Sequence, residues 1–223
     1  MKHIPSLLIG AASSNSGKTT FTIGLQRALV RRHVEVQPFK CGPDYIDTLY
    51  HRLATGRDSI NLDSFLSSSE HLRELFRRYS EGADVCVIEG VMGLFDGYDV
   101  SLGSCAEIAL LLDVPVVLVV NARSMAYSVA PLLYGYLHFQ PRLRIAGVVF
   151  NMVGSDRHLG FLRQACCDVG LDCLGYLPRN PELVIPNRHL GLTIQVKERM
   201  EQLISLAADE VERHVNLDKI LAL

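Results

Sequence analysis

The chain has 223 residues, of which 48% are hydrophobic and 21% charged, a balance typical of a packed globular domain. Its formal net charge of -2 offers no positive field of the kind that attracts nucleic acid or an anionic membrane. The longest apolar run, residues 114–120, is far too short to span a membrane, and the N-terminus lacks the pattern of a signal peptide. We therefore expect a soluble, cytoplasmic protein that binds neither nucleic acid nor membrane, with its cysteines reduced.

Short apolar runs alternate with helical patterns along the whole chain. We expect strands at residues 6–10, 34–39, 85–88, 116–120, 145–150 and 173–176. Most of them are apolar throughout, as parallel strands covered on both faces are. Helical spacing of apolar residues lies between them, behind an expected N-terminal cap at Ser69 in one case, and a last helix carries its stripe at Val196, Met200, Leu203, Ile204 and Ala207. This alternation predicts one α/β domain over residues 1–215, with a doubly wound, mostly parallel sheet and helices on both faces.

Residues 12–19 follow the first expected strand and open a helix, which is the context of a P-loop. Backbone N–H groups of such a loop converge on phosphate oxygens, so ATP is the expected ligand. Lys18 would reach the β- and γ-phosphates, and the Thr19 hydroxyl would bind Mg²⁺. The expected nucleotide-binding residues are Ser14, Asn15, Ser16, Gly17, Lys18, Thr19 and Thr20.

Polar residues follow the other strands, at the edge where ligands of open α/β sheets bind. Lys40, Asp44 and Asp47 come after the second expected strand, and Glu89 and Asp96 come after the third. Carboxylates beside a triphosphate suit Mg²⁺, and Glu89 is the first candidate for a metal contact beside Thr19, with Asp47 as a further one. Each of these acids could instead cap a turn or a helix. Asn151, after the fifth expected strand, is in a position to contact a purine edge.

With these motifs in view, the chain resembles the cobyrinic acid a,c-diamide synthases. The resemblance rests on the P-loop and on residues 37–47, 61–63, 89–97 and 188–192, which together span almost the whole chain. It implies a dethiobiotin-synthetase-like fold of the P-loop NTPase type. It also implies an ATP-dependent amidoligase that phosphorylates the c and then the a carboxylate of cobyrinic or hydrogenobyrinic acid. Ammonia then displaces the phosphate and leaves an amide. Asn15 departs from the family, which usually has glycine there.

For the mechanism we hypothesise that Lys18, Lys40 and Mg²⁺ neutralise the γ-phosphate and the incoming carboxylate. Asp44, Tyr45, Asp47 and Asp96 resemble family positions linked to substrate handling and intermediate formation. Arg179 would line the adenine pocket beside Asn151. The expected substrate contacts are Tyr45, Ile46, His51, Arg188 and His189.

In full-length members of that family, ammonia comes from glutamine through a C-terminal glutaminase domain. We expect residues 216–223 to begin the linker to such a domain, which this chain does not contain, and a homodimer is possible. Three alternatives stay open from the sequence. They are a partition-type ATPase switch, dethiobiotin synthetase, and a synthase that amidates nickel-sirohydrochlorin. A switch of that kind carries an additional lysine early in its P-loop, and residues 10–15 contain none.

Overall fold

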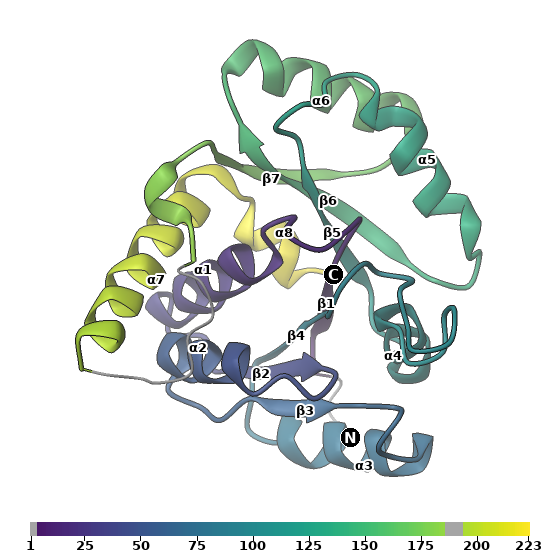
Figure 1. Cartoon of the computed structure of the whole chain (residues 1–223), viewed down its shortest axis with the longest axis vertical. Coiled ribbons are helices and arrows are strands. Elements are labelled where there is room, and N and C mark those ends of the chain that lie inside the picture. Colours follow the sequence, from purple (N-terminus) through teal and green to yellow (C-terminus); the bar gives the residue numbers. More distant parts are fainter. Residues whose placement is uncertain (1–3, 186–193) are drawn as a thin grey trace.

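The computed structural model describes residues 4–185 and 194–223 of the chain. Its centre is a seven-stranded sheet with the order β3-β2-β4-β1-β5-β6-β7, and every neighbouring pair is parallel (Figure 1). The strands are β1 (Ser6–Ala11), β2 (Val36–Cys41), β3 (Ile60–Leu62), β4 (Val85–Glu89), β5 (Val116–Asn121), β6 (Ile145–Val153) and β7 (Cys173–Pro178). The predicted parallel α/β fold is confirmed.

Helices cover both faces of the sheet. They are α1 (Lys18–Arg31), α2 (Ile46–Thr55), α3 (Ser69–Ser80), α4 (Cys105–Leu112), α5 (Val129–Phe139), α6 (Asp156–Val169), α7 (Ile194–His214) and α8 (Leu217–Leu221), with a 3-10 turn at Pro181–Leu183. One core cluster lies between the sheet and α3, α4, α5 and α6, and another joins the opposite face to α1, α7 and α8. The second helical layer also includes α2, which packs on α1 and α7. No helix among the described residues is long and apolar enough to cross a membrane.

Most strand boundaries differ from the sequence-based expectation by one or two residues. Strand β2 begins and ends two residues later than predicted, so Lys40 lies within it and not after it. Glu89 is the last residue of β4 instead of the first residue after it.

The edge strand β3 was not predicted, because its three residues are too few for a periodic pattern. Strand β6 runs three residues beyond the predicted end, so Asn151 lies within the strand and not after it. Helix α3 is capped by Ser68 instead of Ser69, and the Ser68 hydroxyl accepts a hydrogen bond from the backbone N–H of His71.

The pairing of α1 with α7 shows why a small residue is needed in the first helix. A Cβ atom at Gly24 would lie 2.8 Å from the backbone oxygen of Ala207, so the two helices approach too closely for a side chain there. Four residues of the predicted stripe on α7 are buried in the contact, namely Met200, Leu203, Ile204 and Ala207. The side chain of Val196 lies outside the described part of the chain.

Residues 216–223 pack onto the domain in place of the linker that we expected to begin there. Helix α8 buries Leu217 and Ile220 in the core cluster beneath α1 and α7. The Asn216 side chain caps this helix by accepting from the backbone N–H of Lys219. The domain therefore extends beyond residue 215.

Candidate functional site

The phosphate loop joins the end of β1 to the start of α1. Gly17 has φ 93°, a left-handed conformation that glycine adopts without strain, and Asn15 has φ 60°. A Cβ atom at Gly17 would lie 2.0 Å from the side-chain nitrogen of Asn151. That nitrogen donates a hydrogen bond to the carbonyl of Ser16 at 3.0 Å, so Asn151 supports the loop as well as lining the cavity beside it.

A cavity of about 700 Å³ opens above the loop, a volume within the range of small-molecule sites. Most of the residues predicted to bind nucleotide or metal, or to act in catalysis, line it together. These are Ser14, Asn15, Gly17, Lys18, Thr19, Thr20, Lys40, Asp44, Asp47, Glu89 and Asn151. They come from the ends of β1, β2, β4 and β6 and from α1 and α2, which is how the carboxyl edge of a parallel sheet assembles a site.

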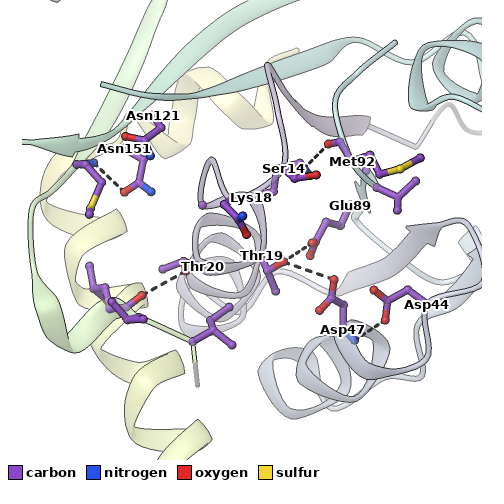
Figure 2. A pocket seen from close by; sticks show the side chains of 18 of the residues that line it. Ser14, Lys18, Thr19, Thr20, Asp44, Asp47, Glu89, Met92, Asn121 and Asn151 are labelled. Atoms are coloured by element: carbon purple, nitrogen blue, oxygen red, sulfur yellow. Dashed lines mark hydrogen bonds between the residues drawn. The ribbon is translucent and has the colours of Figure 1, made fainter. Parts of the chain in front are cut away.

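Thr19, Asp47 and Glu89 point toward one another from α1, α2 and β4 (Figure 2). The Thr19 hydroxyl donates to Oε1 of Glu89 at 2.6 Å and lies 3.5 Å from Oδ2 of Asp47. A hydroxyl and two carboxylates, all hard oxygen donors beside a phosphate loop, are the ligand set that Mg²⁺ prefers. These three residues, predicted as the metal contacts, therefore fit that ion.

Lys40 lies beneath this group and is almost completely buried. Its Nζ is 3.1 Å from Oδ2 of Asp47 and 3.2 Å from Oε1 of Glu89, and it donates to the carbonyl of Gly90 at 2.8 Å. A buried ammonium needs such partners, because desolvation without them is costly. The lysine is thus held at the floor of the cavity, between the two candidate metal ligands.

The charges in this group shift one another's protonation. Burial alone would lower the pKa of Lys40, but the neighbouring carboxylates of Glu89 and Asp47 outweigh it and raise that pKa. Burial would likewise raise the pKa of Glu89, whereas Lys40 and a hydrogen bond from His51 bring it far below its usual value. Burial and the charge of Glu89 raise the pKa of Asp47 from 3.8 to about 6. Asp47 is therefore the carboxylate of the pair that protonates first as the pH falls.

His51 lies behind Glu89 and is fully buried, so its ring is not accessible at the protein surface. Its Nε2 is 2.7 Å from Oε2 of Glu89 and its Nδ1 is 3.0 Å from the hydroxyl of Ser59. This placement departs from the predicted substrate contact. The sequence did hold a signal, because Asp47 and His51 are four residues apart and so share one face of α2.

The loop after β4 and helix α5 both contact the phosphate loop, through Met92 and Tyr136, which were not among the predicted site residues. Lys18 donates to the carbonyl of Met92, whose φ of 50° is left-handed. The hydroxyl of Tyr136, on α5, donates to the carbonyl of Ala12 at 3.1 Å. Asp96 is exposed, does not line the cavity and accepts from the backbone N–H of Gly93 at 2.9 Å, so it caps the turn of this loop.

The remaining predicted residues lie at the edge of the cavity, at the protein surface, or outside the described part of the chain. Asp44 lines the cavity and also caps the first turn of α2, because its Oδ1 accepts from the backbone N–H groups of Ile46 and Asp47. Tyr45 is 64% exposed at the start of that helix. Arg179 is exposed, and its neighbours Pro178 and Asn180 line the cavity in its place. Arg188 and His189 lie outside the described residues.

Residues 7–194 match the model of the CobQ/CobB/MinD/ParA nucleotide binding domain family. The chain belongs to this family. It is 46% identical to a cobyrinate a,c-diamide synthase of Picrophilus torridus, over 98% of this chain and 50% of that protein. It is 47% identical to a hydrogenobyrinate a,c-diamide synthase of Brucella ovis, over 96% of this chain and 49% of that protein. The chain thus spans about half the length of these relatives, which confirm the resemblance inferred from its motifs.

Two solved structures share the fold. The cell division protein MinD of Aquifex aeolicus superposes with a TM-score of 0.57 at 14% identity, over 94% of this chain and 97% of that one. The septum site-determining protein MinD of Pyrococcus horikoshii, complexed with Mg-ADP, gives 0.53 at 18% identity, over 95% of this chain and 97% of that one. At these identities the likeness establishes the architecture alone.

Proposed function

We propose that this domain catalyses the ATP-dependent amidation of the a and c side-chain carboxylates of cobyrinic or hydrogenobyrinic acid, as a step of cobalamin biosynthesis. The names of the relatives indicate the substrate class. The observation that carries the chemistry is the group of Thr19 with the buried side chains of Lys40, Asp47 and Glu89, which line one cavity together with the phosphate loop. Such a group can hold ATP, Mg²⁺ and a carboxylate in one place.

The reaction needs a step that turns a carboxylate into an acyl donor, because direct attack by ammonia would have to expel oxide. In the proposed route a carboxylate oxygen attacks the γ-phosphorus of ATP, the bond to the β-phosphate oxygen breaks, and ADP leaves. Ammonia then attacks the acyl phosphate carbon, and inorganic phosphate departs with the carboxylate oxygen as an amide forms. Phosphoryl transfer of this kind depends mostly on positioning and on neutralising charge.

The residues of the cavity divide this work. Backbone N–H groups at the start of α1 would hold the phosphates, and Lys18 would exchange the Met92 carbonyl for phosphate oxygens. Thr19, Asp47 and Glu89 would hold Mg²⁺, which when bound neutralises charge on the phosphates. Lys40 would add a fixed positive charge beneath the carboxylate that reacts, since its ion pairs with Asp47 and Glu89 keep it protonated and in place.

A turnover assay tests the proposal with ATP, Mg²⁺, ammonium and one candidate acid at a time. We expect ADP release that depends on cobyrinic or hydrogenobyrinic acid. The amount of ADP released should equal the amount of amide formed, which is measured by mass spectrometry. Diaminopelargonic acid, the substrate of dethiobiotin synthetase, should give no turnover. A rate of ADP release that is the same with and without each tetrapyrrole would contradict the proposal. Amidation of nickel-sirohydrochlorin alone would also contradict it.

A pair of lysine variants sharpens the assay. Lys40→Ala should lower turnover at saturating substrate about 10²–10³-fold, the usual cost of losing one preorganised electrostatic contact. Lys219→Ala is the matched control, because Lys219 forms a surface ion pair with Asp172 at 2.7 Å, where both side chains are about half exposed. Near-normal turnover of Lys40→Ala would remove this lysine from the mechanism.

A further inference from the structure

Glu89 has its two carboxylate oxygens in different surroundings. Oε1 faces the cavity, where it accepts from the Thr19 hydroxyl at 2.6 Å and lies 3.2 Å from Nζ of Lys40. Oε2 faces the protein interior and is 2.7 Å from Nε2 of His51. Rotation about the last side-chain bond of a glutamate is soft, so the partners of the two oxygens decide which way the carboxylate faces.

His51 is itself held in one orientation. Its ring is fully buried on the inner face of α2, and Nδ1 lies 3.0 Å from the hydroxyl of Ser59, just before β3. An ionised carboxylate can only accept hydrogen bonds, so Nε2 of His51 carries a proton and donates to Glu89. Ser59 fixes the other ring nitrogen, in the way that outer partners fix histidines beside metal sites.

We infer that His51 is a positioning residue for the metal site, and that it acts by holding Oε2 of Glu89 so that Oε1 faces Thr19. The inference rests on the proposed function, in which Glu89 is a Mg²⁺ ligand. Without His51, Oε2 would be left buried without a donor. The carboxylate would then turn so that Oε2 approaches Nζ of Lys40, and Oε1 would no longer face the metal position.

The test separates nucleotide binding from its metal dependence. A fluorescent ADP analogue is titrated into the protein in EDTA and then at increasing Mg²⁺, for the wild type and for His51→Ala. Loss of an outer partner of a metal ligand commonly costs 10–100-fold in metal affinity. We expect affinity in EDTA to be unchanged and the half-saturating Mg²⁺ concentration to rise about 10–100-fold.

Three further variants control the experiment. The amide nitrogen of His51→Gln can donate to Oε2 as Nε2 does, so this variant should restore the wild-type Mg²⁺ requirement. His158→Ala removes a histidine that also has two hydrogen-bond partners, the Met125 carbonyl and the Gly154 N–H, but on α6, and it should leave the requirement unchanged. Ser59→Ala should raise the requirement less than His51→Ala does, and it decides the question if His51→Ala fails to fold.

The outcomes distinguish the inference from the function on which it rests. An unchanged Mg²⁺ requirement in His51→Ala, or in Ser59→Ala where the former does not fold, would overturn the inference while leaving the proposed amidation intact. A parallel loss of affinity in EDTA and in Mg²⁺ would overturn it too, because that pattern marks general damage. A wild type that binds Mg²⁺-nucleotide yet amidates no tetrapyrrole would instead refute the proposed function alone.

Discussion

Replacing Asp47 by asparagine should stabilise the metal-free domain at neutral pH. Asp47 is 2% exposed, close to Glu89, and its pKa is raised from 3.8 to about 6. A raised carboxyl pKa means that folding favours the protonated form, so the stability that this group contributes is present below about pH 4 and is lost as the pH rises through 6. A rise of about 2 pH units, at about 1.4 kcal/mol each, corresponds to no more than about 3 kcal/mol.

Urea unfolding in EDTA, at intervals from pH 4 to pH 8, measures this difference. Asp47→Asn and the wild type should be equally stable near pH 4. At pH 7 and above, the free energy of unfolding of the variant should be higher by up to about 3 kcal/mol. Mg²⁺ with ADP should reduce this difference in stability, because Mg²⁺ binds the folded wild type through the carboxylate that the variant lacks. A flat difference across the pH range, or a variant that is less stable at pH 7, would show that the ion pair with Lys40 outweighs burial.

Three other predictions follow from local geometry. Gly17→Ala places a Cβ atom 2.0 Å from the side-chain nitrogen of Asn151, so this variant should lose ADP binding while keeping its helical circular dichroism. Gly160→Ala, whose Cβ meets no atom within 4 Å, should bind ADP normally. Tyr136→Phe loses a hydrogen bond to the phosphate loop worth about 1 kcal/mol, so the KM for ATP should rise about five-fold without a change in kcat; an unchanged KM would deny the contact a role. A hydrogen bond from Cys166 lowers the pKa of Cys173 from 9.0 to about 7, so its alkylation, followed by peptide mass spectrometry, should have a midpoint near pH 7 that moves upward in Cys166→Ala.

The grouping of Thr19, Asp47 and Glu89 was predictable from the sequence. Glu89 is the last residue of β4, and Thr19 and Asp47 lie in the first turns of helices that follow β1 and β2. The carboxyl ends of parallel strands meet at one edge of the sheet. Lys40 was selected on the same ground, although its burial between two carboxylates was not foreseen. Sequence position alone does not say how deep a side chain lies.

Other features depend on contacts between distant segments, for which a single sequence holds no local signal. The Tyr136 hydroxyl reaches a carbonyl 124 positions away, and Lys18 reaches one 74 positions away. The placement of His51 could be predicted in part. Its four-residue spacing from Asp47 marked a common helix face, but the direction of that face was set by the packing of α2 on α1 and α7.

The most direct test of the central claim follows an oxygen atom. Cobyrinic acid with carboxylates enriched in a heavy oxygen isotope is turned over with ATP, Mg²⁺ and ammonium, and the released inorganic phosphate is analysed by mass spectrometry. If the domain phosphorylates the carboxylate before amidation, one heavy oxygen per amide formed passes into phosphate. Phosphate that carries only ordinary oxygen, released alongside the amide, would contradict the acyl phosphate route and the role assigned to the cavity.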